Sequence, residues 1–212
     1  MNIADIRKDY KLQSLSEKDV DRNPFRQFDV WWREAVDSQI DEVNAMTLAT
    51  ANTAGIPSAR IVLLKGYDDN GFIFFTNYNS HKSADIKENP NACLVFFWKE
   101  LERQVRITGG IEQISEKESD EYFHSRPMIS RIGAWASDQS SEIDSRETLE
   151  EKFKTLEQTY SNKEIPRPPH WGGYRVIPSL IEFWQGRSGR LHDRIEYTLE
   201  ESDSWTFKRL SP

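Results

Sequence analysis

Residues 58–76, Ser-Ala-Arg-Ile-Val-Leu-Leu-Lys-Gly-Tyr-Asp-Asp-Asn-Gly-Phe-Ile-Phe-Phe-Thr, contain the pattern that decides the fold. Two runs rich in β-branched and aromatic residues, Ser58 to Tyr67 and Phe72 to Thr76, flank the turn sequence Asp68-Asp69-Asn70-Gly71. A turn of this composition between two such runs is typical of an antiparallel hairpin. The segment therefore predicts strands that pair with each other.

Further runs of the same kind lie on both sides of this hairpin. In the first half of the chain they are Met46 to Thr50, Ala92 to Trp98 and Gln104 to Ile114. In the C-terminal part they are Arg175 to Val176, Leu180 to Gln185, Arg194 to Leu199 and Trp205 to Leu210. Short strands joined by polar turns predict an antiparallel meander.

Helical periodicity appears before and between these runs. The expected helices are Pro24 to Val43, Ser83 to Glu88, one from the capping box at Ser115 that kinks or restarts at Pro127, and Ser145 to Tyr160. Strands early and late, with helices between them, predict an α+β fold that is mainly β and is built around an antiparallel barrel.

The expected boundaries follow from where the apolar periodicity begins. Residues 1–22 are charged and lack it, which predicts a mobile N-terminal arm. Residues 23–212 are expected to form a single domain, because a chain of 212 residues suits one compact core.

The composition excludes several classes of protein. Thirty-five acidic and 28 basic residues give a net charge of −7, which argues against a broad nucleic-acid-binding surface. The single Cys93 excludes disulfide scaffolds, and its apolar setting predicts a buried structural thiol. His81, His124, His170 and His192 lie far apart, so no metal site is expected. No apolar run is long enough for a signal peptide or a membrane span, so we expect a cytoplasmic protein with no membrane partner.

Cations stand where the apolar pattern would not place them. Arg60 and Lys65 bracket the apolar residues 61–64, and Ser80-His81-Lys82-Ser83 opens a short helix. Both groups suit a phosphate, since free backbone N–H groups and cationic side chains attract anions. Simpler explanations stay open, because strand-end cations also extend to solvent and serine caps helices without a ligand.

Two more groups lie further along the chain. Tyr122, Arg126 and Ser130 follow at four-residue intervals, which suits either a second phosphate or a solvated face. Glu182 to Arg194 crowds three arginines and a histidine around glycines, which favours an anionic ligand, although a solvated hairpin has the same composition. The chain lacks the G-x-G-x-x-G, P-loop, H-E-x-x-H and G-x-S-x-G motifs. With 12% aromatic residues, the pattern suits a phosphorylated aromatic cofactor and a phosphorylated substrate.

Three motifs are more specific than these groups. They are Tyr122-Phe-His-Ser-Arg-Pro127, Glu182-Phe-Trp-Gln-Gly186 and Arg190-Leu-His-Asp-Arg194. Taken together with the segments above, they resemble the pyridoxamine 5'-phosphate oxidase family in the family's order. The resemblance implies a split β-barrel homodimer with FMN at the subunit interface. It also implies oxidation of pyridoxamine or pyridoxine 5'-phosphate by O2 to pyridoxal 5'-phosphate and H2O2.

The resemblance further implies which residues bind each ligand. FMN would contact Arg60, Ile61, Val62, Leu63, Leu64, Lys65, Phe75, Thr76, His81, Lys82 and Gln104 of one chain and Gln139, Ser140, Trp184 and Arg194 of the other. The substrate would contact Arg7, Lys8, Asp9, Tyr10, Lys65, Tyr122, Arg126, Ser130, Arg190, Leu191 and His192. Arg190 and His192, over the substrate ring, would be the catalytic residues.

Two positions depart from the family pattern. His81 stands where many members have arginine, so a bidentate donor is replaced by one whose charge depends on pH. Phe75 replaces a common tyrosine and lacks its hydroxyl.

Three other functions stay open from the sequence. A split-barrel flavin reductase would keep the FMN residues without needing the whole substrate set. A flavin-binding or pyridoxal-phosphate-carrying protein would bind its ligand without consuming O2. A ligand-free dimeric barrel would purify colourless.

Overall fold

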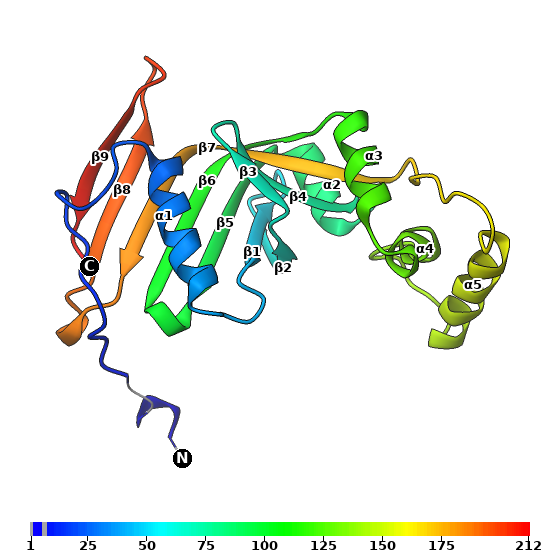
Figure 1. Ribbon diagram of the computed structural model, residues 1–212, viewed down its shortest axis with the longest axis horizontal. Helices are drawn as coiled ribbons and strands as arrows, with labels where there is room; N and C mark the ends of the chain where they lie inside the picture. The colour runs from blue at the N-terminus through cyan, green and yellow to red at the C-terminus, as the bar shows by residue number, and fades with distance from the viewer. Residues whose placement is uncertain (1, 6–7) are drawn as a thin grey trace.

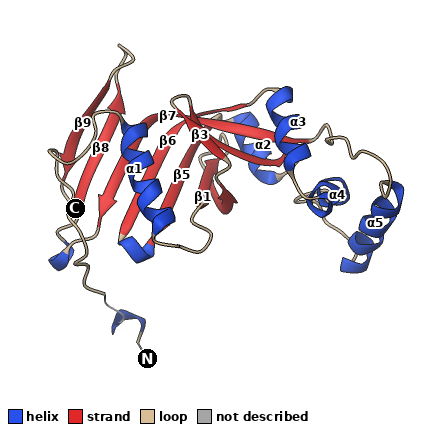
Figure 2. Ribbon diagram, viewed as in Figure 1, coloured by secondary structure: helices blue, strands red, loops and turns tan. Residues whose placement is uncertain are grey.

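Nine antiparallel strands form one sheet within residues 2–5 and 8–212, which are the residues that the computed structural model describes (Figure 2). The strands are β1 (Ala45–Ala51), β2 (Pro57–Leu63), β3 (Gly66–Asp68), β4 (Gly71–Asn77), β5 (Asn91–Trp98), β6 (Arg103–Gln113), β7 (Trp171–Gln185), β8 (Asp193–Leu199) and β9 (Trp205–Leu210). They run in the order β2-β1-β5-β6-β7-β4-β3; β8 also pairs with β7, and β9 pairs with β8. The expected mainly-β fold is confirmed.

The hairpin at residues 68–71 forms as predicted, but the run before it is two strands. Asp68 pairs with Gly71, whose φ of +139° suits glycine. The run Ser58 to Tyr67 breaks after Leu63, because the backbone changes its hydrogen-bond partner there. The Leu64 amide donates to the Asn44 carbonyl beside β1 at 2.8 Å, whereas the Lys65 amide donates to the Ile73 carbonyl of β4 at 2.8 Å.

Five α-helices and three short 3-10 turns accompany the sheet in the described part of the chain. They are α1 (Pro24–Asp37), α2 (His81–Glu88), α3 (Glu116–Ser125), α4 (Met128–Ala136), α5 (Arg146–Thr159), η1 (Ile3–Asp5), η2 (Lys99–Leu101) and η3 (Ser188–Arg190). The capping box at Ser115 and the restart after Pro127 are confirmed. The extension of α1 to Val43 is wrong, because Gln39 and Glu42 adopt positive φ and end the helical path.

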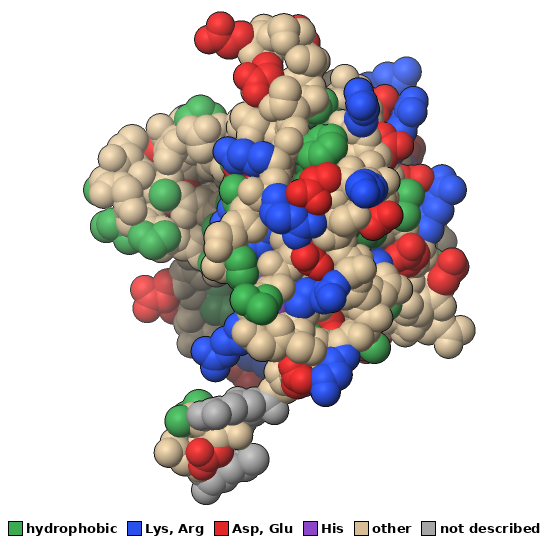
Figure 3. Space-filling view, turned by 90° about the vertical axis from the view of Figure 1, so that its left-hand side faces the viewer, with side chains coloured by type: hydrophobic (Ala, Val, Ile, Leu, Met, Phe, Trp, Pro, Cys, Tyr) green, Lys and Arg blue, Asp and Glu red, His purple; other side chains and the backbone are tan. Residues whose placement is uncertain are grey.

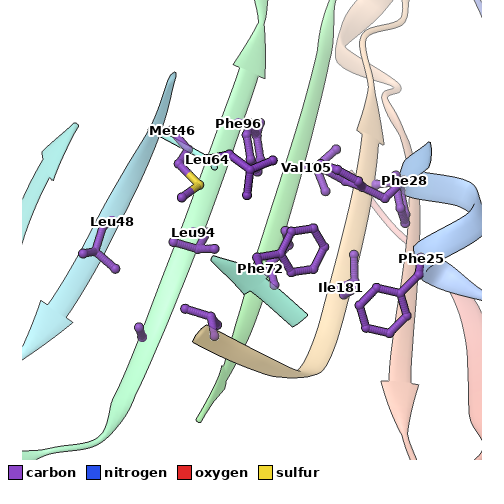
Figure 4. Close-up of a cluster of buried hydrophobic side chains, with 14 of the residues drawn as sticks. Phe25, Phe28, Met46, Leu48, Leu64, Phe72, Leu94, Phe96, Val105 and Ile181 are labelled. Atoms are coloured by element: carbon purple, nitrogen blue, oxygen red, sulfur yellow. The ribbon is translucent and has the colours of Figure 1, made fainter. Parts of the chain in front are cut away.

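The main core lies between α1 and the inner face of the sheet (Figure 4). Phe28 is fully buried, and its ring centroid lies 4.9 Å from that of Phe72 on β4. Burying a side chain of this size contributes about 2 kcal/mol, and Phe28 is one of six buried residues of α1. Cys93 is only half-buried, because it faces away from this core on β5; the expectation of a buried thiol is wrong.

Strand β7 is one strand of 15 residues where two runs were expected. Pro178 interrupts the apolar pattern but is accommodated where the pairing with β6 shifts between Thr108 and Gly109. A side chain at Gly109 would lie 1.9 Å from the Ile177 carbonyl oxygen, so glycine is required there. The continuous strand runs from α3 at one end of the molecule to the β8–β9 hairpin at the other (Figure 1).

Helices α3 to α5 gather at one end of this strand (Figure 1). A second cluster of buried side chains lies among them and consists of Phe123, Ile132, Ile165 and Trp171. At the other end, the segment before α1 lies along the sheet, and Leu15 is buried there. The mobility of residues 1–22 and the single domain over residues 23–212 stay predictions.

Candidate functional site

A cavity of about 770 Å³ opens between β2, β4 and the α3–α4 region. Many residues implied for the cofactor and substrate lie in its wall. They are Arg60, Ile61, Val62, Leu63, Lys65, Phe75, Thr76, Lys82, Tyr122, Arg126, Ser130 and Gln139. Segments that are far apart in the sequence therefore meet in one site.

Lys82 is the most deeply buried cation of the cavity. It lies in the first turn of α2, and its Nζ donates to Thr76 Oγ1 at 3.0 Å, Ser80 Oγ at 2.9 Å and Gln139 Oε1 at 2.6 Å. These acceptors are neutral. Burial, and secondarily the charge of Arg60, lowers the pKa of Lys82 to about 8. An anionic ligand would supply the missing countercharge.

Arg60 lies beside Lys82 on the edge strand β2. Its guanidinium donates to Thr50 Oγ1 at 2.7 Å and also contacts Ser58 Oγ. The nearest carboxylate, Asp85, is 3.9 Å away and is itself bonded to Thr50. Burial lowers the pKa of Arg60, although the charge of Asp85 acts against this. The pair of cations thus has one carboxylate at the limit of ion-pair distance.

The kink between α3 and α4 builds the opposite wall. Arg126 caps α3 and Pro127 precedes α4, so the turn brings Tyr122, Arg126 and Ser130 into the same cavity. The Arg126 guanidinium lies 4.6 Å from the ring centroid of Trp171, and burial lowers its pKa. Its Nη1 is buried and has no hydrogen-bond partner among the described residues. Such a donor is costly unless a ligand accepts from it.

Stacked aromatic rings line the space beside Arg126. The ring centroid of Phe75 lies 3.9 Å from that of Tyr122 and 5.4 Å from that of Trp171. Trp171 and Asn77 also line the cavity but were not singled out as site residues from the sequence. The signal for Trp171 was its position just before Gly172-Gly173, where the β7 backbone approaches Tyr78 and Ile114 closely.

Three implied cofactor residues lie outside the cavity wall on the same side of the molecule. Leu64 is buried in the core. His81 is exposed at the start of α2, and its backbone amide donates to Ser140 Oγ at 3.2 Å. Ser140 and Gln139 thus contact α2 of their own chain, so a second subunit is not needed to bring these two residues to Lys82.

A second group of implied residues lies at the far end of β7. Gln104, Trp184 and Arg194 are direct neighbours across β6, β7 and β8. The Trp184 and His192 ring centroids are 4.6 Å apart, and the Tyr10 ring packs edge-on against both. The rest of the group comprises Lys8, Asp9, Arg190 and Leu191; Arg7 lies outside the described residues.

Carboxylates pair with two of the three arginines in this second group. Arg194 bonds to buried Glu182 at 2.7 and 3.1 Å, and these bonds raise its pKa. Arg187 lies 3.2 Å from Asp193. Arg190 is exposed, has a φ of +62° and makes no ion pair within the described part of the chain. Carboxylates therefore neutralise Arg187 and Arg194 of this arginine-rich loop. Of its three arginines, Arg190 is the one whose charge stays available to a ligand.

The tautomer of His192 follows from one hydrogen bond. The backbone amide of Arg187 donates to His192 Nδ1 at 3.1 Å, so this nitrogen is an acceptor. In the neutral ring the proton then lies on Nε2. His192 is therefore prepared to donate a hydrogen bond from Nε2.

The cavity and the far-end group do not meet within one chain. Trp171 lines the cavity at the start of β7, and Trp184 lies near its other end. An extended strand rises about 3.3 Å per residue, so the ends of β7 are up to roughly 45 Å apart. Figure 1 shows the orange turn η3 and helices α3 and α4 at opposite sides of the molecule.

Within residues 2–5 and 8–212, no group of three or more His, Cys, Asp or Glu side chains is arranged to hold a metal ion. Among the helices of these residues, none has both the length and the apolar character needed to cross a membrane.

Two family models match the chain. The model described as pyridoxamine 5'-phosphate oxidase matches residues 32–160. The model described as the pyridoxine 5'-phosphate oxidase C-terminal dimerisation region matches residues 171–212, which include the far-end residues Trp184 to Arg194.

Curated relatives match over nearly their whole length. A pyridoxine/pyridoxamine 5'-phosphate oxidase of Trichormus variabilis is 62% identical over 210 residues, which cover 99% of this chain and 98% of that protein. One of Paraburkholderia phymatum is 58% identical over 210 residues, with 99% of both chains covered.

Solved structures have the same fold. PhzG from Burkholderia lata, in complex with tetrahydrophenazine-1-carboxylic acid, matches with a TM-score of 0.89 and 30% identity, covering 95% of this chain and 99% of that one. A pyridoxamine 5'-phosphate oxidase-related, FMN-binding protein from Nostoc punctiforme matches with a TM-score of 0.72 and 18% identity, covering 89% and 97%. The second likeness concerns the fold alone.

Proposed function

The chain belongs to the pyridoxamine 5'-phosphate oxidase family, and from this premise we propose how its residues divide the work of the reaction. It is an FMN-dependent oxidase that converts pyridoxamine and pyridoxine 5'-phosphate with O2 to pyridoxal 5'-phosphate and H2O2. The observation that carries the proposal is the set of incompletely neutralised cations in one cavity, namely Arg60, Lys82 and Arg126.

The cavity residues fit two phosphorylated ligands. Arg60 and Lys82 would hold the FMN phosphate, since both are partly buried and Lys82 has only neutral hydrogen-bond partners. Lys65, Tyr122, Arg126 and Ser130 would hold the substrate phosphate across the cavity, where the buried Nη1 of Arg126 lacks an acceptor. When bound, FMN supplies the two-electron acceptor that O2 reoxidises.

The protein contributes chiefly by placing the two ligands. Phosphate clamps on opposite walls restrict how each flat ring can lie in the cavity, and such restriction contributes several kcal/mol to lowering a barrier. The stacked rings of Phe75, Tyr122 and Trp171 limit the space beside the substrate clamp. Phe75 packs through its ring face, which needs no hydroxyl.

We further propose a homodimer in which each chain completes the other's site. The far-end group cannot reach its own cavity, since β7 separates the two. A second copy would bring Trp184, Arg190, His192 and Arg194 to the cavity of the first. Exposed apolar side chains on the outer sheet face, Ile61 and Phe97, supply a surface for this contact. The match of residues 171–212 to a dimerisation region supports the arrangement.

Arg190 and His192 would then act on the substrate ring. Arg190 makes no ion pair among the described residues, so its charge is available to stabilise negative charge that develops on the substrate. His192 would orient the substrate by donating from Nε2, because Nδ1 is occupied by the Arg187 amide.

The test is to measure H2O2 and pyridoxal 5'-phosphate together from the FMN-reconstituted protein. With either pyridoxamine or pyridoxine 5'-phosphate, H2O2 and pyridoxal 5'-phosphate should form at the same rate as each other. The unphosphorylated vitamers should yield neither product. Turnover of unphosphorylated vitamers at the same rate would contradict the substrate-phosphate clamp. Flavin binding without peroxide would favour a reductase or carrier.

The dimer and the cellular location need separate tests. Light scattering should give twice the chain mass of 24.8 kDa, and a monomer that turns over at full rate would contradict the shared site. A cytoplasmic location stays a proposal, and fractionation of the source cells tests it.

A further inference from the structure

We propose that Glu102 is a positioning residue whose buried carboxylate fastens residues 8–12 to the sheet and so holds Tyr10 against Trp184 and His192. The inference rests on the proposed function, because it assigns the far-end group to the substrate site. It adds a residue that belongs neither to the cavity nor to the far-end group.

The carboxylate of Glu102 is bonded to residues 8–12. It is 3% exposed, and its Oε2 accepts hydrogen bonds from the backbone amides of Lys11 at 2.8 Å and Leu12 at 3.1 Å. Its Oε1 lies 3.3 Å from Lys8 Nζ. Burial acts to raise the pKa of Glu102, but these amides and Lys8 together lower it. A charged carboxylate that accepts several donors at once is a strong fastening.

The backbone of the same residue is fastened to the end of β7. The Glu102 carbonyl accepts from the Gly186 amide at 2.8 Å and from Gln185 Nε2 at 3.2 Å. Its φ of +55° turns the chain after η2 so that carbonyl and carboxylate can make these different contacts. Glu102 thus joins the N-terminal segment to the strand that leads into the His192 loop.

Tyr10 is held closely by this arrangement. A side chain on Gly186 would lie 2.7 Å from Tyr10 Cγ, so the tyrosine packs directly on the backbone that follows β7. Ser188 Oγ donates to the Tyr10 carbonyl at 3.1 Å. The Tyr10 ring centroid lies 5.9 Å from that of His192. Release of residues 8–12 would therefore remove one wall beside His192.

The neighbouring buried residue Arg103 also contacts the N-terminal part of the chain, but it does not bond to residues 8–12. Arg103 contacts Gln13, Glu34 and Gln185 and stacks 4.3 Å from the Trp31 ring centroid. These contacts secure α1 and the segment after residue 12. Glu102 instead bonds to the backbone amides of Lys11 and Leu12, directly after Tyr10, so together with Ser188 it determines where the tyrosine lies.

The first experiment compares Glu102→Gln, Glu102→Ala and the control Glu100→Ala in the FMN-loaded dimer. Glu100 lies in η2, is exposed and contacts only Lys99 at 3.5 Å among the ion pairs of the described chain. The readouts are hydrogen exchange of the Lys11 and Leu12 amides and KM for pyridoxine 5'-phosphate.

We expect the alanine variant to exchange both amides at least about tenfold faster and to raise KM about tenfold, since a hydrogen bond to a charged group is worth more than a neutral one. The value of kcat should change less than about threefold, because Arg190 and the FMN clamp are untouched. The glutamine variant should recover part of the protection, because its amide oxygen can still accept from Lys11 and Leu12 but carries no charge. Glu100→Ala should match the unaltered protein.

A second pair of variants changes Lys11 and tests the same hydrogen bond from the exposed side. This pair decides the proposal if Glu102→Ala does not fold. Lys11→Pro removes the amide that donates to Oε2, while Lys11→Ala keeps it. The lysine side chain is exposed, so neither change disturbs the core. We expect only the proline variant to expose the Leu12 amide to exchange and to raise KM.

Three results would overturn the proposal. The first is unchanged hydrogen exchange of the Lys11 and Leu12 amides in Glu102→Ala, and the second is the same exchange and KM in Lys11→Pro and Lys11→Ala. The third is a loss of kcat and of bound FMN in Glu102→Ala as large as its change in KM. The exchange measurement needs no substrate. If the unaltered protein failed to oxidise pyridoxine 5'-phosphate, the proposed function would fail while the fastening of residues 8–12 would still be decided.

Discussion

The two ends of β7 use the same residue types for opposite purposes. At the cavity end, Lys82 is buried and Arg126 is half-buried, and neither has a carboxylate partner among the described residues. At the other end, Arg194 is bonded to Glu182 and Arg209 to Glu17 and Asp193. Figure 3 shows the face at this end, where basic and acidic side chains are interspersed. In the proposed function, the cations without a carboxylate partner bind the ligands, whereas the paired cations stabilise the fold.

Arg190 lies at the end of β7 where the other arginines are paired with carboxylates, but it has no such partner among the described residues. Its replacement is therefore expected to have the largest effect. Arg190→Ala should lower kcat/KM about 100-fold or more, because in the proposed function it removes a charge that would stabilise the transition state. FMN should stay bound, since Arg60 and Lys82, which would hold its phosphate, are unchanged in this variant. Steady-state oxidase assays and the flavin absorbance of the purified protein measure the two effects. An unchanged kcat/KM would show that Arg190 does not take part in the reaction.

Arg126 tests whether the partnerless donor serves the substrate. Arg126→Ala should raise KM for pyridoxamine 5'-phosphate about 30-fold, because a charge-assisted bond to phosphate is lost. Arg146→Ala is the matched control, since that arginine lies on α5 and pairs only with Glu150 among the described carboxylates. A KM equal to that of the control would mean that the cavity cation is structural.

Lys82 makes the cavity sensitive to pH. Its pKa of about 8 in the free protein means that it is charged below pH 8 and increasingly neutral above it. A phosphate binds the charged form, so the FMN affinity should fall as the pH rises, by about tenfold between pH 7 and pH 9.

Fluorescence titration of the FMN-free protein with FMN measures this change. Lys82→Arg should remove the decline, because arginine stays protonated in this range. His81→Asn in the same titration separates the contribution of the neighbouring histidine. A decline that persists in Lys82→Arg and disappears in His81→Asn would assign the pH dependence to His81.

Replacing Glu182 tests whether the ion pairs at the far end of β7 stabilise the fold, and its expected effect is the smallest of the four. Its carboxylate is 3% exposed and contacts both Arg106 and Arg194, which are partly exposed. Glu182→Gln should lower the free energy of unfolding by about 1 kcal/mol, since both arginines can turn towards water. Thermal unfolding measures the loss, with Glu196→Gln as the more exposed control on β8. A loss of kcat without a loss of stability would show that Glu182 serves the reaction.

Local patterns were enough to predict much of the fold and many site residues. The Asp68 to Gly71 turn and the Ser115 capping box depend on neighbouring residues, and both formed as predicted. The cations at Arg60 and Lys82 were visible because they interrupt apolar or capping patterns. The apolar pattern could not predict the end of α1, since Gln39 and Glu42 end the helix through their backbone conformation.

The sequence by itself determined where most of the strands and turns lie and which kinds of side chain the site contains. Only the tertiary structure decided which of those side chains meet. The kink at Pro127 aims Arg126 into the cavity, Glu182 neutralises Arg194, and Glu102 fastens residues 8–12. The reason is physical: propensity and capping act over a few residues, whereas a partner for a charge depends on strand register and packing between distant segments. Whether a cation is free for a ligand is therefore a property of the fold.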